Sequence, residues 1–217
     1  MLEFSLVLPI LLTLMLGGIQ LVAYVNATRK VELVAQSISQ MISQSVPPQG
    51  STIATVNATD LHFSYDATLV LFPYLMKDSQ RQGMLWWQDI MIKYASVSFT
   101  QKAANCTDST DMSACYAANV VWTSTGTTGS NTRPCAVPLL PADNTAPPSV
   151  GTLPRSVFGP ASLIVIDVAF TFTPTFGAKF FPAARIARSA YVQPRYATLV
   201  NYDTTNSDGI ATKCPGY

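Results

Sequence analysis

Four cysteines are the residues of this chain best suited to covalent chemistry, and their even number predicts disulfides. The chain has no Cys-x-x-Cys pair and a single histidine, so the spacings fit no zinc site. Three pairings are possible, and free buried thiols are the alternative. We favour a bond from residue 106 to 115, which would close a short polar loop, and one from 135 to 214, which would pin the C-terminus. The cysteines concerned are Cys106, Cys115, Cys135 and Cys214.

Other side chains of catalytic type form no recognised pattern. The sequence contains no Gly-x-Ser-x-Gly, no His-Glu-x-x-His and no phosphate-binding glycine loop. The lone histidine, His62, excludes most metal and triad schemes that need two or more. Four carboxylates that could matter are spread along the chain: Asp66, Asp78, Asp89 and Asp167. We therefore expect no enzyme, no cofactor and no metal, and the net charge of +1 gives no reason to expect nucleic acid as a partner.

Glu3 is a carboxylate that directly precedes a long apolar run, Phe4 to Val25, which contains no Asp, Glu, Lys or Arg. About 20 helical residues, each rising about 1.5 Å, span a hydrocarbon core of about 30 Å. The run is longer than the apolar core of a signal peptide, and no small-x-small cleavage pattern follows it. Residues 1–25 are therefore predicted to form a retained transmembrane helix.

Three residues within this run could shape contacts between helices. Pro9 removes one backbone hydrogen bond and bends or loosens its turn. Gly17 and Gly18 offer a flat patch on which another helix could lie closely, although their spacing is not the small-xxx-small motif. The alternatives are a simple kink at the proline and a merely tolerated pair of glycines.

The helical pattern continues beyond the apolar run, because apolar residues recur at helical spacing over residues 26–46. Pro47-Pro48 stops it. We predict one helix from about Leu2 to Ser45, with an amphipathic second half that must lie against an apolar surface.

Residues 47–217 are predicted to form an extracytoplasmic β-rich head. A short helix is expected over 61–72, capped by Thr59 or Asp60, and one helical turn over 180–184. Residues 126–160 are expected to be a long loop, either functional or mobile. The expected strands cover 87–100, 116–124, 162–173 and 186–192. The fold class is α+β: a long N-terminal transmembrane and amphipathic helix packed on a small antiparallel sheet, as in pilins.

Trp86-Trp87, with Met84 and Leu85, form an aromatic and apolar cluster. Such a cluster packs either into the core against the long helix or against a membrane surface or partner.

The text LEFSLVLPILLTLMLGGIQ followed by RKVELVAQSISQMIS resembles the TadE/TadG-like pilus-assembly proteins of tight-adherence type IV pili. Members typically carry a glutamate, a short apolar run and a Leu-Pro or Ile-Pro step, here Glu3 and Leu8-Pro9. The stretches FTFTPTFG and YVQPR also look like the body of some members. In the family a peptidase cuts after a glycine that leaves the glutamate fifth; here it is third and follows no glycine, so such processing is an expectation from the family alone.

The resemblance implies a minor pilin or pseudopilin, anchored by a single pass in the bacterial cytoplasmic (inner) membrane. Its partners would be the membrane and other pilin-like subunits or pilus-assembly components, in a homo- or hetero-oligomer. Glu3 would pair with the N-terminal amine of a neighbour and set helix register; the alternative is an acid favoured by the helix dipole.

Placement of the head in the periplasm, or on the cell surface or pilus, rests on the disulfide prediction, since disulfides need an oxidising compartment. Arg29-Lys30 would by itself favour the opposite orientation. A rival interpretation is a membrane-tethered periplasmic binding or adhesion module that contacts its target through residues 126–160.

Overall fold

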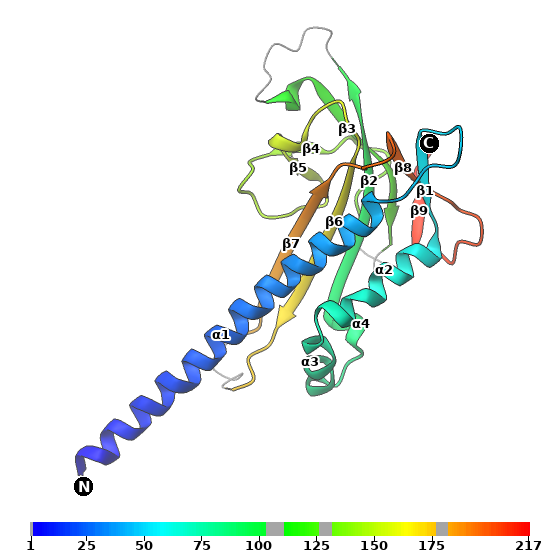
Figure 1. Cartoon of the computed structure of the whole chain (residues 1–217). Coiled ribbons are helices and arrows are strands. Elements are labelled where there is room, and N and C mark those ends of the chain that lie inside the picture. The colour runs from blue at the N-terminus through cyan, green and yellow to red at the C-terminus, as the bar shows by residue number, and fades with distance from the viewer. Residues whose placement is uncertain (1, 103–110, 126–131, 177–181) are drawn as a thin grey trace.

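The computed structural model describes residues 2–102, 111–125, 132–176 and 182–217, and for residues 2–6 it describes the backbone alone. One helix, α1 (Leu2–Ser43), extends far beyond the rest of the molecule, as Figure 1 shows. Pro9 lies inside this helix without ending it. The predicted long helix is therefore confirmed, and it ends two residues before the expected position.

An antiparallel sheet of five strands forms the centre of the head, in the order β7-β6-β2-β3-β9. The predicted α+β class is confirmed. The strand expected at 116–124 is found at those residues, and the strongest expected strand, at 162–173, is an interior strand of the sheet. The strands are β2 (Ile90–Gln101), β3 (Tyr116–Ser124), β6 (Leu163–Phe172), β7 (Ala184–Val192) and β9 (Ala211–Lys213).

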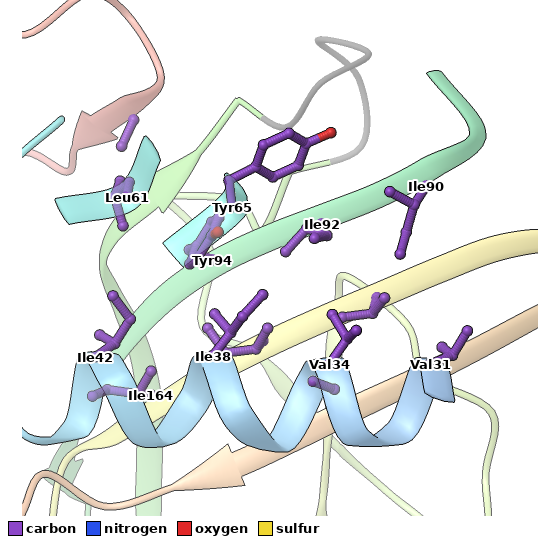
Figure 2. Close-up of a cluster of buried hydrophobic side chains, with 14 of the residues drawn as sticks. Val31, Val34, Ile38, Ile42, Leu61, Tyr65, Ile90, Ile92, Tyr94 and Ile164 are labelled. Atoms are coloured by element: carbon purple, nitrogen blue, oxygen red, sulfur yellow. The ribbon is translucent and has the colours of Figure 1, made fainter. Parts of the chain in front are cut away.

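The second half of α1 packs on one face of this sheet, against β6 and β7. Its apolar stripe is buried, which is why an amphipathic helix of this length is stable beside the sheet. Figure 2 shows the stripe directed toward the side chains of β2. The buried residues of α1 are Ala27, Val31, Val34, Ala35, Ile38 and Ile42.

Residues 132–160 cover the opposite face of the sheet, so the expected long loop is in this part an ordered layer. It contains a short parallel pair, β4 (Leu140–Ala142) and β5 (Thr152–Pro154), and a 3₁₀ turn, η2 (Arg155–Val157). Leu139, Leu153 and Phe158 are buried in a second core that also contains residues of β2, β3 and β6. These three side chains hold the segment to the sheet, although its composition is that of a loop.

Three helices connect α1 to the sheet: α2 (Ala58–Leu71), α3 (Tyr74–Gln82) and α4 (Trp86–Asp89). The expected cap of the first was wrong. Asn57 is the N-cap, because its side chain accepts a hydrogen bond from the Asp60 backbone amide while the Asp60 carboxylate accepts one from the Asn57 amide. The strand expected from residue 87 begins after α4, at Ile90.

Several short elements differ from the expected ones. β1 (Ile53–Val56) and β8 (Leu199–Tyr202) pair in parallel, and η1 (Met112–Ala114) precedes β3. Ala184 begins β7, so the helical turn expected over 180–184 is wrong at that residue; residues 180 and 181 lie outside the described part of the chain.

Candidate assembly surface

The first half of α1 presents apolar side chains on all its sides. Among the described residues, Val7–Ser43 is the helix with the length and hydropathy to cross a membrane, and no part of its most apolar window is buried. Leu14 is 72% exposed and Val22 is 70% exposed. Because this much apolar surface is unfavourable in water, the first half of α1 is matched to lipid or to other helices.

The expected assembly residues lie on this exposed half. Glu3 and Pro9 are both in α1, but the side chain of Glu3 is outside the described part of the structure. A Cβ atom added at Gly17 or Gly18 would meet nothing within 4 Å, so both glycines face open space in the single chain. Their proposed contact with a neighbouring helix is sterically possible and stays a prediction.

Within the described residues, the loop after β6 contacts α1 at Gln20. The Gln20 side-chain amide lies 3.4 Å from the backbone nitrogen of Thr175 and 3.4 Å from the backbone oxygen of Phe176. One turn later, the rings of Tyr24 and Phe172 meet edge to face at 5.6 Å. The loop after β6 therefore fixes the head beside the middle of α1.

One disulfide is present in the described part of the structure, between Cys135 and Cys214. These residues are 79 positions apart in sequence, and their Cα atoms are 5.2 Å apart. This is the pairing that the sequence led us to favour, and it fastens residues 132–160 to the C-terminus. Cys115 is buried, but Cys106 lies outside the described residues, so the second pairing stays a prediction.

A buried ion pair also fastens residues 132–160 to the sheet. Arg133, 2% exposed, donates from Nε and Nη2 to the two carboxylate oxygens of Asp167 at 3.1 and 3.0 Å. Its Nη1 donates to the Thr152 carbonyl at 3.0 Å, and the Ser189 hydroxyl also donates to Asp167. With these hydrogen bonds the charges are matched, so the cluster has a structural role.

Two acidic residues, Asp78 and Asp89, are buried together between α3 and α4. The Gln82 amide donates to Asp78 at 2.8 Å and to Asp89 at 3.4 Å. Burial, and secondly the nearby Asp78 charge, raise the pKa of Asp89 to about 7. No sequence pattern predicts this pairing, because the two residues are 11 positions apart and in different helices.

The tryptophan pair is divided between the core and the surface. Trp86 packs against Tyr65 with ring centroids 5.1 Å apart, whereas Trp87 is 38% exposed and Leu85 is 56% exposed. Both tryptophans line a pocket of about 450 Å³, together with His62. His62 pairs with Asp208 at 2.5 Å, and the described residues contain no group of three or more potential metal ligands.

A family model described as TadE-like protein matches residues 1–38. The match contains the exposed half of α1 with its glutamate, proline and glycine pair, and it reaches into the half that packs on the sheet. It confirms the resemblance to TadE-like pilus proteins over these residues, about a sixth of the chain. Neither the search of curated proteins nor the search of solved structures returned a match.

Proposed function

We propose that this chain, whose first 38 residues match the TadE-like family, is a membrane-anchored minor pilin or pseudopilin of a tight-adherence pilus. The observation that carries the proposal is the division of α1 into two halves. The apolar stripe of the second half is buried against the sheet of the same chain, and the first half is exposed on every side. The first half of α1 therefore offers the larger apolar surface for an intermolecular contact.

In this proposal the first half lies in the cytoplasmic membrane and packs against like helices of pilin-like subunits or assembly components. The head stands in the periplasm or on the pilus, where the Cys135–Cys214 disulfide persists. The work of the protein is assembly through helix packing, and it is not an enzyme. Glu3 pairs with a charged group of a neighbour, because an unpaired carboxylate at the edge of hydrocarbon is costly.

Replacing Glu3 with alanine tests the proposal. We expect the variant to insert into the membrane normally but to be lost from sheared pilus or assembly fractions, by about tenfold or more if the charge pair is made in lipid. Glu32→Ala is the matched control, since Glu32 is an exposed acid on the half of α1 that packs on the sheet. Normal incorporation of the Glu3 variant would contradict the assembly role.

A second candidate is a tethered binding or adhesion module, which the aromatic pocket at Trp86 and Trp87 favours. Such a module could also bind its target through residues 126–160. Deleting these residues would be a poor test, because the deletion removes Cys135 and buried core residues. Replacing the exposed Val137 and Leu140 with serine leaves that core intact. Loss of adhesion with normal pilus assembly in this variant would favour the second candidate.

A further inference from the structure

The head has an apolar end at the same level as the point where α1 emerges. We name it the basal rim and define it by its exposed apolar residues, which come from α3, the connection to α4, α4 and the loop after β6. Their exposed fractions range from 36% to 56%. They are Met76, Met84, Leu85, Trp87 and Phe176.

Contacts along the chain place this rim beside α1. Arg81 of α3 donates to the Thr173 carbonyl, and the amide of Thr175, two residues on, faces Gln20 of α1. Phe176 itself is at the Gln20 contact. Figure 1 shows the same arrangement, with α3 and α4 at the end of the head from which the first half of α1 leaves.

The length of the apolar run sets the depth of the rim in a membrane. Phe4 to Val25 is an uncharged run of 22 residues, and at about 1.5 Å each it is about 33 Å long, close to a hydrocarbon core of about 30 Å. Gln20 lies five residues, or about 7.5 Å, before the end of that run. A helix seated across the core therefore brings Phe176 within about 8 Å of the edge of the hydrocarbon.

The charges and side-chain types of the rim suit a lipid surface. Lys77 is exposed on α3. The Arg81 side chain is 30% exposed and is paired with the buried carboxylate of Asp78, and Asp89 is buried as well, so no carboxylate of residues 74–89 is exposed on the rim. Tryptophan is enriched at membrane–water interfaces, and basic residues near the surface are attracted to anionic headgroups.

We propose that the basal rim rests on anionic lipid headgroups and forms a second membrane contact beside the α1 span. The inference rests on the proposed membrane anchoring of α1 and adds a fixed orientation of the head. With the rim seated, α1 and the head meet the surface together.

Tryptophan fluorescence of the full chain in vesicles tests this contact. Trp122 is fully buried and donates to the Val200 carbonyl, and Trp86 is partly buried, so Trp87 is the reporter, and Trp87→Phe assigns its signal. The vesicles contain phosphatidylglycerol and a lipid spin-labelled near its headgroup, at one chain per many lipids. We expect the label to quench Trp87, and Leu85→Glu to reduce this quenching by about threefold.

Leu140→Glu is the matched control, because Leu140 is 64% exposed, against 56% for Leu85, but lies on the layer across the sheet. It should leave the quenching unchanged. Trp87 reached by aqueous iodide but not by the lipid label would overturn the rim contact. The rim contact would also be overturned if neither quencher reached Trp87 at high protein density but one of them did after dilution. A second copy of the chain would then be covering Trp87. Flotation of the vesicles reports the insertion of α1 separately. A chain that floats with the vesicles but shows no quenching would contradict the rim contact alone. A chain that does not float would contradict the membrane anchoring as well.

Discussion

At the residue scale, Asp89 is a buried carboxylate whose pKa is raised into the neutral range. The folded pKa of Asp89, about 7, is raised above its ordinary value of 3.8. The folded chain therefore binds more protons than the unfolded chain between these values, and the free energy of unfolding falls as pH rises through this window. Below pH 4 the contribution is fully present, and above pH 7 it is lost.

Asp89→Asn should remove this dependence, because the amide carries no charge at any pH. In detergent, the wild-type chain should lose on the order of 1–3 kcal/mol between pH 5 and 8, and the variant much less. Urea unfolding at several pH values measures the difference. Asp66→Asn is the control, since Asp66 is an exposed aspartate on α2; equal pH slopes for wild type and Asp89→Asn would disprove the assignment.

Asp167→Ala should be among the most destabilising changes in the head. It leaves the guanidinium of Arg133 buried without its carboxylate, and breaking a buried pair in this way costs about 3–5 kcal/mol. The double variant Arg133→Met with Asp167→Ala should recover part of that loss in urea unfolding. A single variant as stable as the double would show that the charge pair is unimportant.

The disulfide could be predicted from sequence, whereas the buried ion pair could not. The preferred pairing of Cys135 with Cys214 followed from the few pairings that four cysteines allow. Asp167 stood in a strong strand pattern, but its partner Arg133 is 34 positions away in a segment of loop composition. Nothing local selects that partner, because the fold of residues 132–160 brings the two together.

At the element scale, the helices and strands with the longest periodic patterns of apolar residues were predicted most accurately. α1 and β6 carry many periods of helical or strand spacing, and both were found within two residues of the expected bounds. β1, β8 and β9 have three or four residues each, too few to show a period. The parallel pairing of β1 with β8 joins segments about 146 positions apart and depends on the completed head.

Packing of α1 on the sheet can be tested with a matched pair of substitutions. Ile38 is fully buried and Met41 is 38% exposed, three positions along the same helix. Ile38→Ala should cost about 2–4 kcal/mol in urea unfolding, and Met41→Ala less than about 1 kcal/mol. If the two costs were equal, the second half of α1 would not be part of the core.

At the scale of the whole molecule, the first half of α1 is exposed and apolar, and the second half is packed on the sheet. Truncations of different length should separate the contributions of the two halves. A chain without residues 1–19 keeps the contacts of Gln20 and Tyr24 with the head. We expect it to be a folded, soluble monomer by size-exclusion chromatography and circular dichroism.

A chain without residues 1–46 should aggregate, because the sheet face covered by α1 would be exposed. If the shorter truncation failed to fold, the first half of α1 would be contributing to the head. If the longer truncation folded well, the second half of α1 would be dispensable.

The unbroken course of α1 has a mechanical consequence. The helix runs along β6 and β7, so tension applied through its first half is transmitted parallel to those strands (Figure 1). Such a load shears the whole row of helix side chains against the sheet at once and does not peel them away one by one. A protein built in this way is suited to carry tension between the first half of α1 and the head.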